Sequence, residues 1–208
     1  AIAAGLQAKQ AGLRSFNIDL MHGLPEQSVS DALSDLQQAI EIAPPHLSWY
    51  QLTIEPNTAF GSRPPVLPGD ETLWDIQEQG HQLLLAAGYR QYEISAYAKP
   101  GFECRHNLNY WQFGDYLGIG CGAHGKITMP AEARIIRTVK VKHPKGYLDP
   151  ARAFLDQCWD VDNEDRPFEY FMNRMRLFQP IPKAEFTART NLPAESVEAM
   201  FKRAYEQE

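Results

Sequence analysis

The sequence FNIDLMHGLP, residues 16–25, decides the fold prediction. Residues 16–21 form an apolar run with the alternation and the length of a β-strand, and the run breaks at His22 and Gly23. Asp19 lies inside this run, where a carboxylate is costly unless it is paired or contacts a ligand. Asp19 is therefore either a cap for a nearby loop or a ligand-binding residue.

A helix and a second strand are predicted directly after this strand. Ser28 is an N-cap residue, and Asp31 at the third helical position favours the helix N-terminus. Apolar residues recur on one face of residues 29–40, and the proline pair 44–45 ends the helix. Residues 47–54 are rich in β-branched and aromatic residues, which predicts a strand.

The same order repeats once more along the chain. Residues 55–69 carry four prolines and are predicted to form a surface loop. Asp70 is predicted to cap the next helix and Gly88 to close it, before a third strand over residues 89–97. Alternating strands and helices predict parallel βαβ units with right-handed crossovers. Three such units cannot close a barrel, so they indicate part of a larger sheet.

Ligands in such folds bind beyond the carboxyl ends of the strands. The polar residues at those ends are Asp19, His22, Thr53, Glu55, Glu93 and Ser95. His22, Glu55 and Glu93 have the chemistry of acids or bases, but their spacing pairs none of them, so no role is assigned.

Residues 104–125, CRHNLNYWQFGDYLGIGCGAHG, contain two histidines, four aromatic residues and five glycines. The segment follows neither helical nor strand periodicity. The glycines allow positive φ angles and close approach to a ligand, and the composition suits a flat, apolar ligand with a coordinating centre. The alternative is a glycine-rich turn between two packed strands.

After residue 125 the pattern changes to a hairpin followed by helices. The predicted elements are a hairpin of strands 126–129 and 134–141, a helix over 147–158, a charged linker at 160–166, a helix over 168–178 with Phe168, Phe171, Met175 and Phe178 at helical spacing, and a helix over 194–207 started by Pro193.

The composition excludes several classes of protein. A net charge of −6 without a basic stripe does not suit nucleic-acid binding. Cys104, Cys121 and Cys158 form neither an even disulfide set nor a metal knuckle, which indicates reduced thiols in a cytoplasmic protein. No apolar run approaches the ~20 residues of a membrane span, and residues 1–15 do not resemble a secretory leader. Because the sequence lacks an initiator methionine, we expect a piece of a longer protein.

Four motifs resemble the radical SAM family that includes oxygen-independent coproporphyrinogen III oxidases. They are FNIDLMHGLP at 16–25, LSWYQLTIEPNT at 47–58, HNLNYW at 106–111 and GIGCGAHG at 118–125. HNLNYW is similar to the HNxxYW signature of the haem-chaperone (HemW-type) branch, whereas the first motif is shared with the oxidases. Residues 166–178, RPFEYFMNRMRLF, look like the family's C-terminal domain.

The resemblance implies an α/β fold. Residues 1–125 would be the C-terminal half of a partial (β/α) radical SAM barrel of the TIM-like type. Residues 126–208 would be a smaller, mostly helical C-terminal accessory domain, itself incomplete.

The resemblance also implies cofactor-binding residues. Asp19 matches a residue that contacts S-adenosylmethionine (SAM), and Thr53 and His124 fall at further SAM-contacting positions. The haem candidates in the HNxxYW motif are His106, Asn107, Tyr110 and Trp111. His106 is either a hydrogen-bonded structural residue or a haem ligand, and the aromatic rings of Tyr110 and Trp111 suit a porphyrin face.

The function implied is that of a cytoplasmic chaperone that binds haem and transfers it to haem-requiring proteins, touching a membrane only through a client. The alternative is an oxygen-independent coproporphyrinogen III oxidase, which carries out SAM-dependent oxidative decarboxylation. A third hypothesis is an unrelated α/β enzyme with a glycine-rich phosphate loop, although such loops favour small residues. The family's CxxxCxxC motif, which binds a [4Fe–4S] cluster, does not occur in this sequence, so the cluster ligands are expected outside the chain and the chain alone is expected to be inactive.

Overall fold

The computed structural model describes residues 2–206. Two compact units divide the chain between Cys104 and Arg105, and each is described separately. The predicted domain boundary after Gly125 follows from the family resemblance rather than from compactness, and it stays a prediction.

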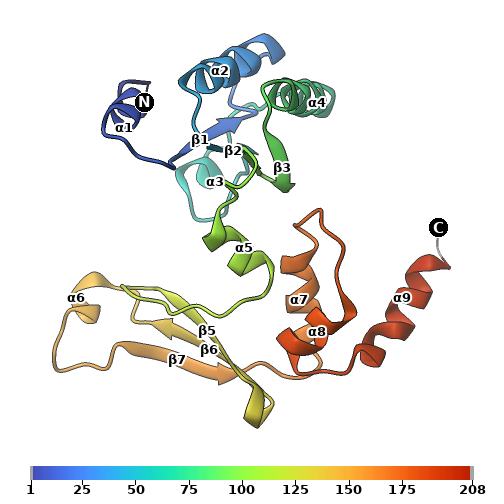
Figure 1. Ribbon diagram of the computed structural model, residues 1–208. Coiled ribbons are helices and arrows are strands. Elements are labelled where there is room, and N and C mark those ends of the chain that lie inside the picture. Colours follow the sequence, from blue (N-terminus) through green and yellow to red (C-terminus); the bar gives the residue numbers. More distant parts are fainter. Residues whose placement is uncertain (1, 207–208) are drawn as a thin grey trace. The chain divides into compact units, whose positions relative to one another are not determined.

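The first unit contains a four-stranded sheet and its helices (Figure 1). Its elements are α1 (Ile2–Gln10), β1 (Asn17–His22), α2 (Val29–Ile42), β2 (His46–Gln51), α3 (Ala59–Ser62), α4 (Asp70–Ala86), β3 (Arg90–Glu93) and β4 (Ala96–Ala98). The strand order is β1-β2-β4-β3. β1 and β2 are parallel, as predicted, with Asn17 opposite His46 and Asp19 opposite Ser48.

The third predicted strand is wrong in detail, because residues 89–97 form a hairpin rather than one strand. β4 pairs antiparallel with both β2 and β3. The turn between them is held by the Gln91 side-chain amide, which donates to the carbonyl of Ile94 at 2.9 Å. The backbone N–H of Trp49 donates to the carbonyl of Ser95 at 2.9 Å, which fixes the turn against β2. The sheet is therefore mixed rather than wholly parallel.

The core of this unit lies between the sheet and the helices α2 and α4, which pack side by side (Figure 1). Its largest fully buried apolar side chains are Trp49, Tyr89, Tyr97, Leu36, Leu47, Ile76 and Leu84. Gly80 in α4 makes room for Trp49, since a Cβ at Gly80 would lie 1.9 Å from Cη2 of the indole. The packing of α4 on the sheet therefore requires glycine at this position.

The helix starts follow local chemistry. Ser28 caps α2, as predicted, and the structure adds that it forms a capping box with Asp31. The N-cap of α4 is Gly69, so the predicted cap at Asp70 is wrong by one residue. Asp70 is the first helical residue, where its negative charge interacts favourably with the positive end of the helix dipole.

The second unit combines a three-stranded antiparallel sheet, in the order β5-β6-β7, with helices. Its elements are α5 (Arg105–Trp111), β5 (His124–Met129), the 3₁₀ helix η1 (Pro130–Glu132), β6 (Arg134–Lys140), α6 (Pro144–Tyr147), β7 (Leu155–Asp160), α7 (Arg166–Arg174), α8 (Lys183–Thr190), the 3₁₀ helix η2 (Ala194–Val197) and α9 (Glu198–Tyr205). The predicted hairpin is confirmed as β5 and β6.

The predicted helix over residues 147–158 is wrong. Pro150 interrupts the segment, since proline breaks a helix interior. The short helix α6 ends before it, and the residues after it form β7 along β6.

The predicted apolar face of α7 differs from the face that packs. Phe171 is buried, but Phe168, Met175 and Phe178 are all exposed. The core of the second unit consists of Phe113, Ile135, Val161, Tyr170, Phe171, Phe186 and Val197. The predicted last helix begins after Pro193 as η2 and continues as α9, and residue 207 lies outside the described residues.

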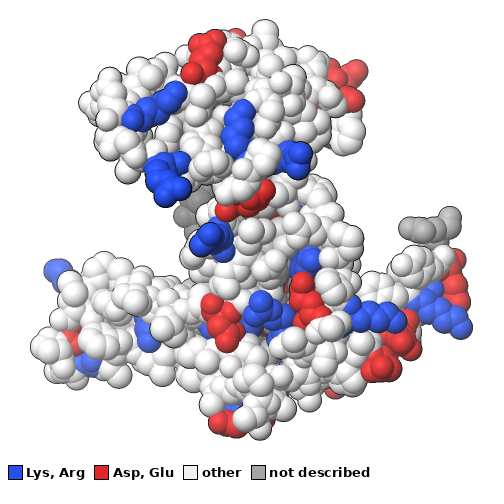
Figure 2. All heavy atoms as spheres, in the orientation of Figure 1, with Lys and Arg blue, Asp and Glu red and all other residues white. Residues whose placement is uncertain are grey.

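The predicted fold class is confirmed: the chain is α/β, with a helical C-terminal part after the second sheet. Acidic and basic side chains both occur on each unit in the face shown by Figure 2. None of the helices described here is long and apolar enough to cross a membrane.

Candidate functional site

Asp19 lies on the face of β1 that points away from the core. Its neighbours Ile18 and Leu20 pack against the α2–α4 core, and side chains alternate along a strand, so Asp19 points to the other side. The side chain of Asn17 donates from Nδ2 to Oδ1 of Asp19 at 2.8 Å. No backbone N–H in residues 2–206 donates to this carboxylate, so the structure does not support the loop-cap alternative.

Asn17 belongs to a polar network that the sequence analysis missed. Its Oδ1 lies 2.6 Å from Nδ1 of His46, and Nε2 of His46 lies 2.8 Å from the hydroxyl of Tyr92. The Nδ2 amide of Asn17 also donates to the hydroxyl of Ser48, on the neighbouring strand, at 3.0 Å. Burial lowers the pKa of His46, and the charges of Asp19 and Glu103 oppose that shift. The sequence contains these polar residues, but only the register of β1 and β2 shows that they lie opposite each other.

Thr53 lies two residues beyond the end of β2 and is exposed. It lines a shallow hollow with Glu55, Thr58 and Phe60. Thr58 caps α3, because its Oγ1 accepts from the N–H of Gly61 at 2.9 Å. The predicted SAM residue Thr53 therefore borders an open surface at the carboxyl end of β2.

His22 is part of the core and not of the strand-end surface. Its ring lies 4.3 Å from that of Trp49, and it is 1% exposed. Neither ring nitrogen has a hydrogen-bond partner among the described residues. Burial lowers the pKa of His22 to about 4, although the nearby Gln77 side chain opposes the shift. Glu93 is likewise buried, at the end of β3.

The motif HNLNYW forms most of helix α5, which corrects the expectation that residues 104–125 contain no helix. The helix is only seven residues long, about two turns, which is too short for a helical pattern of apolar residues to be recognised within the glycine-rich segment. Phe113 follows in the left-handed region with φ 55°, where the chain leaves the helix. The motif therefore presents its side chains from a helical surface.

The rings of His106 and Tyr110, from α5, and of Tyr116, after it, form a row with the exposed histidine at one end. The ring of His106 lies 4.7 Å from that of Tyr110, edge to face. The ring of Tyr110 lies 4.3 Å from that of Tyr116. His106 is exposed, whereas Tyr110 and Tyr116 are half-buried. Two of the haem candidates, His106 and Tyr110, are thus brought together.

The other two candidates have different surroundings. The guanidinium of Arg176 lies 4.2 Å above the ring of Trp111, so one face of the indole is covered. The indole N–H of Trp111 is buried without a hydrogen-bond partner in the described part of the chain. Asn107 is half-buried on the same helix.

The glycines of the segment pack mainly against their own chain. Gly120 and Gly122 have positive φ angles, as expected. A Cβ at Gly114 would lie 2.1 Å from Oδ1 of Asn109, and one at Gly118 would lie 2.2 Å from the carbonyl oxygen of His124. The expectation that these glycines approach a ligand is therefore not supported at Gly114 and Gly118, where close packing explains them.

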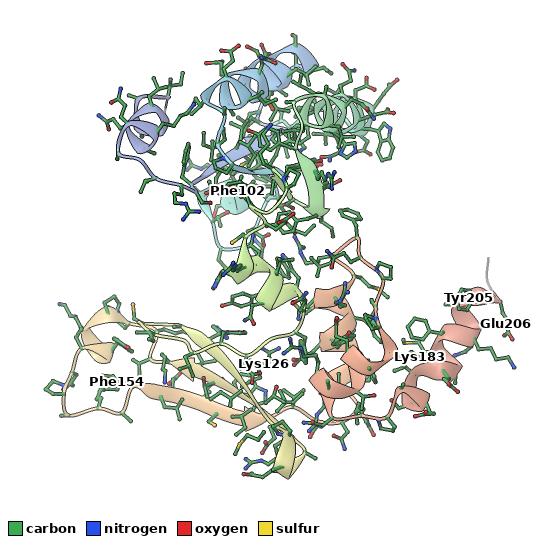
Figure 3. All side chains as sticks on the ribbon, viewed as in Figure 1. Phe102, Lys126, Phe154, Lys183, Tyr205 and Glu206 are labelled. Carbon is green, nitrogen blue, oxygen red and sulfur yellow. The ribbon has the colours of Figure 1, made fainter. Side chains whose placement is uncertain are left out.

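A buried lysine fixes the loop that follows α5 (Lys126 in Figure 3). Lys126 Nζ donates to Asp115 Oδ1 and to the carbonyl of Phe113, both at 3.0 Å. Asp115 also accepts the N–H of Thr128 at 2.9 Å and its hydroxyl at 2.7 Å. Burial lowers the pKa of Lys126, against the effect of Asp115. Although burial opposes it, hydrogen bonds from Thr128 and Lys126 hold the pKa of Asp115 below its usual range.

His124 opens β5 and is exposed. It belongs to the second unit, whereas Asp19 and Thr53 belong to the first. The three residues that the family resemblance assigns to SAM are therefore distributed over both units.

The described residues do not form a metal centre of their own. Within residues 2–206 no group of three His, Cys, Asp or Glu side chains is placed to hold a metal ion. Cys104, Cys121 and Cys158 are free thiols, and the last two are exposed.

Known proteins resemble this chain over most of its length. Residues 161–204 match the family model HemN C-terminal domain. The heme chaperone HemW of Escherichia coli (strain K12) is 65% identical over 191 residues, which are 92% of this chain and 48% of that protein. The HemW of Haemophilus influenzae is 63% identical over 91% of this chain and 49% of its own length. The HemW of Mycobacterium tuberculosis is 34% identical over 95% of this chain.

A solved structure shows the same fold. It is described as coproporphyrinogen III oxidase (HemN) from Escherichia coli, a radical SAM enzyme, and it superposes with a TM-score of 0.71 at 19% identity. It covers 92% of this chain, which corresponds to 47% of that protein. The chain spans about half the length of the curated relatives it matches. Over most of its length the chain is therefore similar to heme chaperones of the HemW type, and it shares its fold with HemN.

Proposed function

We propose that the protein containing this chain is a haem chaperone, which binds haem and passes it to haem-requiring proteins. The observation that carries the proposal is the 65% identity to a heme chaperone HemW over 92% of the chain. The haem-accepting proteins are the partners in this proposal. The cytoplasm is its location, in agreement with the free thiols of Cys104, Cys121 and Cys158.

For haem, the proposal assigns contact to helix α5. The imidazole of His106 is exposed, and neutral imidazole is a common axial ligand of haem iron. The ring of Tyr110 lies against it and offers an apolar surface for a porphyrin edge. Asn107 and Trp111 lie on the same helix, where Trp111, backed by Arg176, would extend the aromatic surface.

For SAM, the proposal assigns contact to Asp19, Thr53 and His124. Asp19 fits a cofactor that carries hydroxyl and ammonium donors, since only one of its carboxylate oxygens is hydrogen-bonded within residues 2–206. SAM bound beside a [4Fe–4S] cluster supplies one-electron chemistry in this family. We assign the cluster ligands to residues outside this chain.

The test is a haemin titration of the full-length protein, reconstituted with its cluster, against the His106→Ala variant. We expect saturable binding with a shifted Soret band, and binding at least about tenfold weaker in the variant because an axial ligand is lost. His143→Ala is the matched control, since His143 is also an exposed histidine of the second unit. Equal binding by all three proteins would place the haem site elsewhere.

The second candidate function is that of a coproporphyrinogen III oxidase. It is favoured by the fold match to HemN, with its TM-score of 0.71. Incubation with coproporphyrinogen III and SAM distinguishes the two functions. Consumption of coproporphyrinogen III, together with no haemin binding, would replace the chaperone proposal with the oxidase.

A further inference from the structure

The polar network behind Asp19 has a direction that the chemistry of its members determines. An ionised carboxylate only accepts hydrogen bonds, so the amide nitrogen of Asn17 must face Asp19, at 2.8 Å. The amide oxygen of Asn17 therefore faces His46, whose Nδ1 lies 2.6 Å away. That nitrogen must carry a proton, since two acceptors would otherwise meet.

The same reasoning extends through the ring of His46. A neutral imidazole protonated at Nδ1 has an acceptor at Nε2, which takes the proton of the Tyr92 hydroxyl at 2.8 Å. The oxygen of Tyr92 in turn accepts the backbone N–H of Cys104 at 3.4 Å. In this network every hydrogen bond, from the Cys104 N–H to the Asp19 carboxylate, therefore donates in the direction of Asp19.

The middle of this network is enclosed, and its end is open. His46 and Tyr92 are 4% and 7% exposed, whereas Asp19 is exposed. Ser48 holds the Asn17 side chain from the parallel strand, at 3.0 Å from Nδ2 and 3.2 Å from Oδ1. The network therefore holds Oδ1 of Asp19 and leaves Oδ2 without a hydrogen bond within residues 2–206.

We infer that His46 and Asn17 are positioning residues for Asp19: the Nδ1–H tautomer of His46 orients the Asn17 amide, which aims the second carboxylate oxygen of Asp19 at a hydroxyl or ammonium donor of SAM. The inference rests on the proposed SAM contact of Asp19. It adds two residues that act through Asp19 without touching the cofactor themselves.

The first measurement is the tautomer. In the full-length protein, ¹⁵N NMR of labelled histidine is expected to show the proton of His46 on Nδ1 at neutral pH. A proton on Nε2 would reverse the network and overturn the inference, whether or not SAM binds.

The second measurement is the SAM dissociation constant, by calorimetry on the cluster-containing protein. His46→Asn keeps a donor near the position of Nδ1, while His46→Gln places its amide near Nε2. We expect His46→Asn to bind SAM within about twofold of the wild type and His46→Gln to bind about tenfold more weakly. Equal losses in both variants, with equal losses in melting temperature, would mean that His46 is only structural.

Two further variants separate the possible failures. Tyr89→Phe removes a buried hydroxyl of the same unit that donates to the carbonyl of Pro44, outside the network, and is expected to bind SAM normally. Asp19→Asn is expected to weaken SAM binding at least as much as His46→Gln. Unchanged binding by Asp19→Asn would refute the proposed SAM contact. Weakened binding by Asp19→Asn with normal binding by His46→Gln would refute only the positioning inference.

Discussion

The two units differ in the kind of basic side chain that they bury. The first unit buries two histidines, His22 and His46, and burial lowers the pKa of both, which favours the neutral rings. The second unit buries three basic side chains, Lys126, Arg166 and Arg174, each 4% exposed or less. Neutral rings are tolerated with few partners, whereas buried charges need several hydrogen bonds.

The difference decides which carboxylates are free to bind a ligand. In the second unit Asp115, Glu169 and Glu185 are each engaged by a basic side chain. In the first unit Asp19 faces no basic side chain among the described residues, and only the Asn17 amide contacts it. These three carboxylates of the second unit therefore stabilise its fold, while Asp19 in the first unit stays available to a ligand.

Among the substitutions considered, Arg174→Met is expected to lower the stability of the second unit most. Arg174 donates to Glu185 at 2.7 Å and to the carbonyls of Gln179 and Pro180. Because its loss leaves buried acceptors unpaired, we expect the free energy of unfolding to fall by about 3–5 kcal/mol. Urea unfolding with amide exchange in the second unit measures this. Arg203→Met, on the exposed surface of α9, is the control and should change little. A loss below about 1 kcal/mol for Arg174→Met would contradict the argument.

The neutral histidines predict a pH dependence. Because the folded pKa of His22 is about 4 and its usual value is 6.5, the unfolded chain takes up a proton first as the pH falls. His22 therefore causes stability to decrease from pH 6.5 down to about pH 4, by about 3 kcal/mol. The lowered pKa of His46 acts in the same direction.

The check is urea unfolding of wild type and His22→Leu between pH 4 and 7. The variant should show a shallower dependence on pH in that window. Parallel curves for wild type and His22→Leu would show that folding does not change the pKa of His22.

Lys126→Met should have a smaller effect than Arg174→Met. Its partner Asp115 keeps two hydrogen bonds from Thr128, and the Asp115 side chain is 45% exposed, so water compensates for part of the loss. We expect a decrease of about 2 kcal/mol in the free energy of unfolding. Lys142→Met, at an exposed position, serves as the comparison. An effect as large as that of Arg174→Met would mean that the Asp115 loop unfolds with the core.

Arg176→Met should give the smallest change. The substitution removes the guanidinium from the face of Trp111, which lowers stability by about 1 kcal/mol. Arg176→Lys keeps the charge but not the planar group, so its free energy of unfolding should lie between those of the wild type and Arg176→Met. The tryptophan emission of the protein, to which Trp111 is one of four contributors in this chain, is expected to shift in both variants. No shift in either would show that the ring contact does not persist in solution.

Local signals in the sequence predicted the elements that local chemistry determines. The capping box at Ser28 and Asp31 is complete within four residues, so the start of α2 was found correctly. The hairpin at β3–β4 was not, because its turn at Ile94 and Ser95 contains no glycine, proline or asparagine to mark it. β7 is defined by pairing with β6 across a long connection, which sequence periodicity does not reveal.

The candidate site divides in the same way. Asp19 and His106 could be proposed from the sequence because they lie inside recognisable motifs. The positioning pair, Asn17 and His46, depends on two parallel strands being in register, with residues 17 and 46 opposite each other. Residues 29 positions apart join one hydrogen bond only after the sheet has formed, so periodicity alone does not identify them.

The exposed thiol of Cys121 gives the molecule a native attachment point for a spectroscopic label. A spin label there and a second at Leu13→Cys, an exposed position of the first unit, would report one distance between the units once Cys104 and Cys158 are replaced by serine. The width of that distance distribution, measured with and without SAM, reports how the spread of distances between the two labels responds to the ligand. Ligand binding would then be read as a change in the width of a distance distribution, without following any reaction.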